Sequence, residues 1–232
     1  MASLWVRWNP VCDQKKENLM GKKQESRQKK KQEVFNLADI RPLTENQALT
    51  MDSDKNLVLS GSAGTGKSFL ACFLAAEDMV NKVTDQIIII RSAVPTRDLG
   101  FLPGNEKEKA SIYEEPYYDI FSEVLCRGDA YEILKKKEIV FFRTSSYTRG
   151  ITFRDATIIV DECQNMTLHE LDSLITRVGD NCRIIFCGDF KQADLKKNGM
   201  HSFVEILKRL DEDFDLIEFT SDDIVRSEFV KR

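Results

Sequence analysis

Residues 61–68 read Gly61-Ser62-Ala63-Gly64-Thr65-Gly66-Lys67-Ser68 and match the pattern G-x-x-x-x-G-K-[ST] at every defined position. The apolar run 56–60 ahead of them predicts a strand, and apolar residues at helical spacing over 68–80 predict a helix behind them. Glycines let such a loop turn tightly and bring its N–H groups onto a polyphosphate at the helix N-terminus. We expect Lys67 to meet the β- and γ-phosphates and the Ser68 hydroxyl to ligate Mg²⁺.

Outside this loop, apolar strands alternate with helices. Three runs, 86–91, 156–161 and 182–187, are apolar on both faces, which is typical of strands buried in a parallel sheet. Together these runs predict an α/β fold with a mostly parallel sheet and helices on both faces. The remaining expected elements are strands over 139–143 and 216–219 and helices over 117–125, 130–134, 168–178 and 201–210.

Two carboxylates, Asp161 and Glu162, stand at the end of the strand predicted over 156–161. The carboxyl ends of parallel strands face the ligand crevice of an open α/β sheet. We therefore expect Asp161 to hold the Mg²⁺ through water and Glu162 to polarise an attacking water. A water-activating glutamate favours a nucleoside-triphosphate hydrolase over a small-molecule kinase, which uses another acceptor.

A third loop follows the strand predicted over 182–187. It reads G-D-x-x-Q from Gly188 to Gln192, and its Gln or Asp is expected to sense the γ-phosphate. By itself this pattern is an ordinary turn after a strand. At the same sheet edge as the other two loops, it supports a helicase-like ATPase.

A candidate base-reading residue precedes the first strand. The Gln47 amide in L-T-E-N-Q (residues 43–47) can donate to and accept from an adenine edge at once, and its spacing resembles the Q-motif of superfamily 1 helicases. The same stretch predicts a helix start, with Thr44 as cap and Gln47 at the third position, and both roles can hold together. Guanine recognition by N-K-x-D is disfavoured, because residues 81–85 (N-K-V-T-D) have one residue too many.

Composition limits the remaining possibilities. The chain has 232 residues, 42% hydrophobic and 31% charged, which is globular and fits one large domain or two small ones. The longest purely apolar stretch, Ile87–Ile90, is too short for a membrane span, and the N-terminus lacks the apolar core of a signal peptide. A net charge of −4 argues against a dedicated duplex-DNA binder. The basic lead, residues 1–33, is expected to be a solvated arm that is disordered or helical, with nucleic-acid or partner contact as the alternative. Residues 34–232 are expected to form the ATPase domain.

The six cysteines form no C-x-x-C pair, and neither histidine lies near a cysteine pair. This spacing disfavours a zinc site. Several of the cysteines lie in apolar runs, so we expect free thiols in a reducing, cytoplasmic compartment.

From about residue 40 onward, the sequence resembles the PhoH-like family of P-loop ATPases. The resemblance rests on R-S-A-V (91–94), L-G-F-L-P-G (99–104), Y-T-R-G-I-T-F (147–153), D-E-C-Q-N (161–165), T-R-V-G (176–179), the G-D-x-x-Q loop and D-I-V-R (223–226). Ser92 replaces a proline of the family pattern, Cys163 an alanine, and residues 227–228 a His-Pro pair.

The resemblance implies one RecA-like core that binds and hydrolyses ATP, in a family linked to RNA processing. Helicases of this class clamp ATP between two cores, the second of which supplies an arginine finger. We therefore expect this chain either to close head-to-tail into a ring, so that a neighbour supplies the arginine, or to act as a slow ATP switch. Arg149, Arg177 and Arg226 are the candidate arginines, and Arg226 could also act in cis.

Single-stranded RNA or DNA is expected to cross the carboxyl edge of the sheet. The candidate contacts, on loops near that edge, are Arg91, Arg97, Phe101, Arg143 and Tyr147, since arginines meet phosphates and aromatic rings stack on bases. The aromatic and acidic stretch 113–121 is expected to be a packing helix or a subunit contact. The alternative function is a non-catalytic, ATP-dependent switch that controls oligomer state or a partner.

Overall fold

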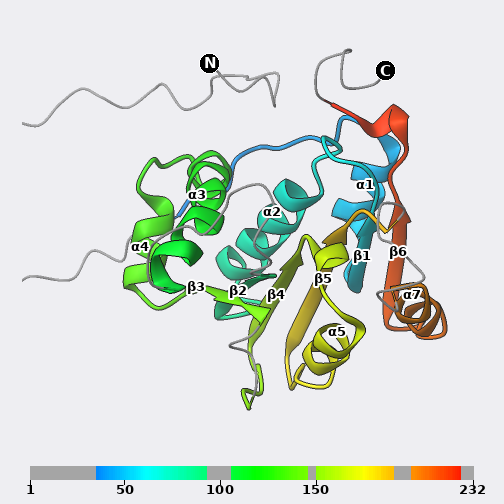
Figure 1. Ribbon diagram of the computed structural model, residues 1–232. Coiled ribbons are helices and arrows are strands. Elements are labelled where there is room, and N and C mark those ends of the chain that lie inside the picture. The colour runs from blue at the N-terminus through cyan, green and yellow to red at the C-terminus, as the bar shows by residue number, and fades with distance from the viewer. Residues whose placement is uncertain (1–34, 93–105, 146–149, 191–199, 226–232) are drawn as a thin grey trace, which may run out of the picture.

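A six-stranded sheet forms the centre of the protein (Figure 1). The computed structural model describes residues 35–92, 106–145, 150–190 and 200–225. The strand order is β3-β2-β4-β5-β1-β6 and all of its strand pairs are parallel, which confirms the expected α/β class. The strands are β1 (Asn56–Ser60), β2 (Gln86–Arg91), β3 (Val140–Thr144), β4 (Ala156–Asp161), β5 (Cys182–Gly188) and β6 (Phe214–Glu218).

Helices cover both faces of the sheet (Figure 1). One layer contains α2, α3 and α4, with α1 beside α2, and the other contains α5 and α7. The helices are α1 (Glu45–Asp52), α2 (Lys67–Val80), α3 (Glu106–Val124), α4 (Ala130–Lys136), α5 (Leu168–Ile175) and α7 (Met200–Lys208), with 3-10 turns η2 (Cys163–Asn165) and η3 (Ser221–Asp223).

The isoleucine run of β2 shows why the sheet is buried on both sides. Ile87 and Ile89 pack in the α2–α3 layer, whereas Ile88 and Ile90 pack in the α5–α7 layer, and none is more than 5% exposed. Successive side chains of a strand point to opposite faces, so an unbroken apolar run needs a covering layer on each side.

Most element boundaries lie within two residues of the sequence expectation, and two helices differ. Helix α3 begins at Glu106, eleven residues before the expected start at 117, and runs through Pro116. Helix α5 ends at Ile175, three residues early, because the chain turns there and Val178 forms a bridge with Phe153.

The strand order assembles the candidate site. Strand β5 lies between β1 and β4, with Ser60 opposite Gly188 and Val160 opposite Phe186. In a parallel sheet the carboxyl ends of neighbouring strands meet at one edge. The 61–68 loop, the Asp161–Glu162 pair and the Gly188–Asp189 turn therefore leave the sheet side by side.

Candidate nucleotide site

The 61–68 loop adopts backbone conformations that favour glycine. Gly61, Gly64 and Gly66 have φ values of 154°, 93° and 88°, in the left-handed region. A Cβ on Gly61 would also lie 2.7 Å from the carbonyl oxygen of Phe219. Helix α2 begins directly after Gly66, and no side chain of the described residues caps it. The N–H groups of its first turn lie next to the loop, where the helix dipole favours an anion.

The Lys67 ammonium lies across the loop. Its Nζ donates to the carbonyl oxygens of Gly61 and Ser62, both at 2.7 Å, and to the Thr65 hydroxyl at 3.3 Å. Burial lowers the pKa of Lys67, while the negative charges around it, including Asp189 and Glu162, oppose that shift. The cation is thus held where phosphate oxygens can replace main-chain carbonyls as its partners.

The hydroxyl of Ser68 and the carboxylate of Asp161, which the sequence assigns to one metal site, are in direct contact. Ser68 Oγ donates to Asp161 Oδ1 over 2.8 Å, and the Glu162 N–H donates to the same oxygen over 3.0 Å. A hydroxyl beside a carboxylate is the kind of oxygen donor pair that Mg²⁺ binds, with waters and phosphate oxygens completing its shell. The donor set therefore fits the predicted metal.

A third donor to Asp161 comes from α3. The Tyr117 hydroxyl donates to Asp161 Oδ2 over 2.6 Å. Burial raises the pKa of this phenol well above its usual value, and the neighbouring Asp161 charge raises it further, so Tyr117 stays protonated and remains a donor. Sequence reasoning placed Tyr117 in a packing helix and missed this contact, because no motif spacing connects it with Asp161.

Glu162 has a strained backbone and a restrained side chain. Its φ of 53° and ψ of 40° are left-handed, a conformation that is costly for a non-glycine residue and clusters at functional sites. Its carboxylate accepts a hydrogen bond from Gln164 Nε2 at 2.5 Å and lies 3.9 Å from the Arg91 guanidinium. Arg91 in turn lies over the Tyr113 ring at 5.5 Å.

Gln164 connects the acid pair with the third loop. While its amide nitrogen donates to Glu162, its Oε1 accepts from the Asp189 N–H at 3.1 Å. Asp189 is only 7% exposed and contributes to the electrostatic environment of Lys67. The Gly188–Asp189 turn is therefore at the site, as expected for a γ-phosphate sensor, whereas Gln192 lies outside the described residues.

Gln47 lies at the start of α1 and contacts the phosphate loop. The Thr44 hydroxyl caps α1 at the Gln47 N–H, which confirms the helix start. The Gln47 side chain accepts from the Leu43 N–H at 2.8 Å and donates to the Thr65 carbonyl at 3.2 Å, which joins α1 to the phosphate loop. An amide has two donors and two acceptor sites, so one of each stays available after these bonds.

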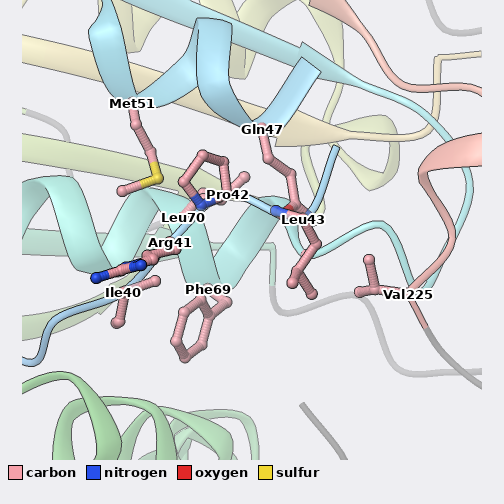
Figure 2. A pocket seen from close by; sticks show the side chains of 10 residues that line it. Ile40, Arg41, Pro42, Leu43, Gln47, Met51, Phe69, Leu70 and Val225 are labelled. Atoms are coloured by element: carbon pink, nitrogen blue, oxygen red, sulfur yellow. The ribbon is translucent and has the colours of Figure 1, made fainter. Parts of the chain in front are cut away.

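A mostly apolar hollow lies beside the loop (Figure 2). Figure 2 shows Gln47 and Met51 pointing from α1 toward the segment 40–43. Phe69 on α2 lies below this segment in the view, and Val225 lies at the far side of the hollow from Met51. The lining residues are Ile40, Arg41, Pro42, Leu43, Gln47, Met51, Gly66, Phe69, Leu70 and Val225. An apolar hollow with one amide at its rim is the kind of site that holds the base of a nucleotide.

Of the five predicted nucleic-acid residues, the two that the structure describes, Arg91 and Arg143, do not share a face of the sheet. Arg91 and Arg143 are strand residues rather than loop residues, which corrects the expectation. Arg143 pairs in register with Ile90, so it lies on the opposite face of the sheet from Arg91, the next residue along β2. Arg97, Phe101 and Tyr147 lie outside the described residues.

Of the three candidate arginines, only Arg177 lies in the part of the chain that the structure describes. Arg177, in the turn that follows α5, donates to the hydroxyl of Ser173 on that helix at 3.1 Å. Arg149 and Arg226 fall outside the part of the chain that the structure describes.

Comparison with known proteins decides the family. A family model described as PhoH-like protein matches residues 39–232. The chain belongs to the PhoH-like family. It is 34% identical over 189 residues to protein PhoH of Escherichia coli, a match that covers 78% of this chain and 52% of that protein. It is 38% identical over 176 residues to the PhoH-like protein of Bacillus subtilis, covering 74% and 54%. The chain thus spans about half the length of the curated relatives it matches.

The fold of this PhoH-like chain is similar to that of a solved structure with low sequence identity. The large terminase of a thermophilic bacteriophage, in complex with ATP-gamma-S, superposes with a TM-score of 0.51 at 16% identity. The match covers 82% of this chain and 48% of the terminase. This likeness supports a P-loop NTPase fold. Among the described helices, none is long and apolar enough to cross a membrane.

Proposed function

We propose that this PhoH-like chain binds ATP with Mg²⁺ and hydrolyses it. The observation that carries the proposal is the direct contact of Ser68 with Asp161, with Lys67 across the loop and Glu162 next in the chain. A phosphate-binding loop alone fits many functions. A loop whose metal-binding hydroxyl already touches the first of two adjacent carboxylates fits hydrolysis of a nucleoside triphosphate.

Each residue of the site would have a distinct role in this hydrolysis. The N–H groups at the start of α2 bind the phosphates, and Lys67 exchanges its carbonyl partners for phosphate oxygens. Ser68 and Asp161 hold the metal, and bound Mg²⁺ neutralises charge on the phosphates. Glu162 orients a water for in-line attack and takes its proton, for which its carboxylate must be turned toward the phosphates.

We also propose that adenine occupies the hollow beside Gln47. The free acceptor site of the Gln47 amide would accept a hydrogen bond from the adenine amino group, and its free N–H would donate to a ring nitrogen. Guanine presents a carbonyl where adenine presents the amino group, so it would oppose the amide acceptor. Arg41 and the apolar lining would pack against the base.

This base assignment gives a prediction for Gln47→Ala. ATP should bind roughly tenfold more weakly, because both hydrogen bonds of the amide to the base and its bond to the Thr65 carbonyl are lost. The preference for ATP over GTP should nearly vanish, as measured by titration of fluorescent nucleotides. Asn46→Ala is the matched control, since Asn46 bonds to Glu218 and Asp223 and does not line the hollow. An unchanged preference in the Gln47 variant would refute the base assignment.

We further propose that turnover is coupled to single-stranded RNA or DNA through Arg91. The Arg91 side chain is 23% exposed at the carboxyl edge of the sheet and pairs with Glu162 at 3.9 Å. The phosphates of a strand at this edge would compete for the guanidinium and release Glu162 for attack. Such coupling would weaken steeply with salt, because phosphate contacts release counterions.

The coupling makes a prediction that compares two arginines. Single-stranded RNA should stimulate phosphate release at low salt, and Arg91→Gln should remove most of that stimulation. Arg143→Gln, on the opposite face of the sheet, should keep it. Equal loss of RNA stimulation in the Arg91 and Arg143 variants would contradict the role of Arg91. So would a wild-type protein that RNA does not stimulate.

A second candidate function is an ATP-dependent switch that controls oligomer state or a partner. The restraint of Glu162 by Gln164 and Arg91 favours it, since a carboxylate with two partners is less free to activate water. Tight ATP binding without phosphate release would support the switch. In either case we propose a cytoplasmic protein that assembles head-to-tail, with Arg149 or Arg226 reaching a phosphate.

A further inference from the structure

We propose that Tyr117 is a positioning residue that fixes the Asp161 carboxylate for the metal. The inference rests on the proposed function, because it assigns Asp161 to Mg²⁺. The structure assigns the two oxygens of Asp161 to different elements. Oδ1 accepts from Ser68 on α2 and from the Glu162 N–H, whereas within the described part of the chain Oδ2 accepts only from Tyr117 on α3.

The phenol and the carboxylate are both removed from water. Tyr117 is 1% exposed and Asp161 is 5% exposed, so water cannot readily replace a lost partner. A buried carboxylate oxygen without a donor is costly, and the group would turn to recover one. Turning would move Oδ1 away from Ser68. The Tyr117 hydroxyl therefore sets which oxygen faces the loop.

Packing holds the Tyr117 ring independently of its hydroxyl. The ring lies 5.8 Å from that of Phe142 and belongs to the core that α2, α3 and α4 share. Phenylalanine at this position keeps the ring and removes only the donor. Its effect on the metal site can thus be separated from an effect on the core.

A second tyrosine in the same core provides a matched control. Tyr131 on α4 is also 1% exposed, and its hydroxyl donates to Glu114 Oε1 over 2.9 Å. Glu114 pairs with Lys135 at 2.8 Å, away from the phosphate loop. Tyr131→Phe removes a buried phenol–carboxylate bond of the same kind without touching Asp161.

The position of Tyr117 on α3 gives that helix a place in the site. Tyr113, one turn earlier on the same helix face, lies against Arg91, the partner of Glu162. Helix α3 thus contacts Asp161 directly and Glu162 through Arg91. One helix, α3, therefore contributes to the positions of both acids, although none of the nucleotide-binding motifs lies on it.

The test measures metal dependence of nucleotide binding rather than turnover. A fluorescent ADP analogue is titrated into the full chain at increasing Mg²⁺ and in EDTA, for wild type, Tyr117→Phe and Tyr131→Phe. Mg²⁺ should increase the affinity for the ADP analogue. We expect Tyr117→Phe to raise about tenfold the Mg²⁺ concentration at which half of this increase is reached, and to leave the affinity in EDTA unchanged. Tyr131→Phe should match the wild type in both conditions.

Thermal unfolding shows whether each variant is folded. If Tyr117→Phe does not fold, Tyr117→Leu also lacks the donor and should show the same rise in the Mg²⁺ requirement. In an Asp161→Asn background, Tyr117→Phe should cause no further change in the Mg²⁺ requirement, because it acts through Asp161. A wild-type Mg²⁺ requirement in Tyr117→Phe, or an equal shift in Tyr131→Phe, would overturn the positioning role alone. A wild type whose ADP binding ignores Mg²⁺ would overturn the proposed metal site as well.

Discussion

Glu162→Gln should almost abolish ATP hydrolysis while ATP still binds. A glutamine keeps the size of the side chain and can still accept the Gln164 hydrogen bond, but it cannot take a proton from water. General-base catalysis contributes about 10²–10⁴-fold to a rate, so single-turnover hydrolysis of bound ATP should slow by about that factor. ATP affinity should stay within a few-fold of wild type, since Lys67, Ser68 and the loop are intact.

The control for this variant is Glu132→Gln, which makes the same change at an exposed position of α4. It should leave hydrolysis unaffected. Turnover within a few-fold of wild type in Glu162→Gln would remove Glu162 from the catalytic role. The base would then have to be sought at another carboxylate of the site, with Asp189 as the first to examine.

Lys67→Ala should lose nucleotide binding itself. The ammonium is expected to bond to two phosphates, and hydrogen bonds to a charged group contribute about 1.5–3 kcal/mol each. Affinity for ATP should therefore fall at least about 100-fold in an equilibrium titration. The exposed Lys136→Ala on α4 is the control and should bind as wild type does.

The same lysine gives ATP binding a pH dependence. Only the charged ammonium attracts phosphates, and burial lowers the pKa of Lys67 in the free protein. Affinity should therefore begin to fall, as pH rises, at a lower pH than an ordinary lysine would allow. Lys67→Arg keeps its charge at alkaline pH, so whatever ATP affinity it retains should lack this decline, and the same decline in both proteins would contradict the assignment.

Much of the fold follows from local patterns in the sequence. Each strand over 86–91, 156–161 and 182–187 is a short apolar run between turn residues, and such runs admit few other structures in a parallel α/β protein. The phosphate loop is equally local, because its glycines, Lys67 and Ser68 act within eight consecutive residues. The contact of Ser68 with Asp161 follows once both motifs are placed at one sheet edge.

The remaining parts of the site depend on long-range geometry. Tyr117 reaches Asp161 only because of the rotation of α3 about its axis, and the sequence of a helix does not state which neighbour each face meets. Arg91 and Arg143 look equivalent as arginines near strand ends. They lie on opposite faces because Arg143 aligns with Ile90, a register that sequence spacing leaves open. The roles of Gln192, Arg149 and Arg226 stay predictions.

The most direct test of hydrolysis at this site is release of inorganic phosphate from ATP by the wild-type chain, followed over time with Mg²⁺ and with EDTA. The proposed function predicts steady release with Mg²⁺ and none above background in EDTA, from the same preparation and at saturating ATP. Tight ATP binding with no phosphate release in either condition would contradict hydrolysis and leave the ATP-dependent switch as the function of this chain.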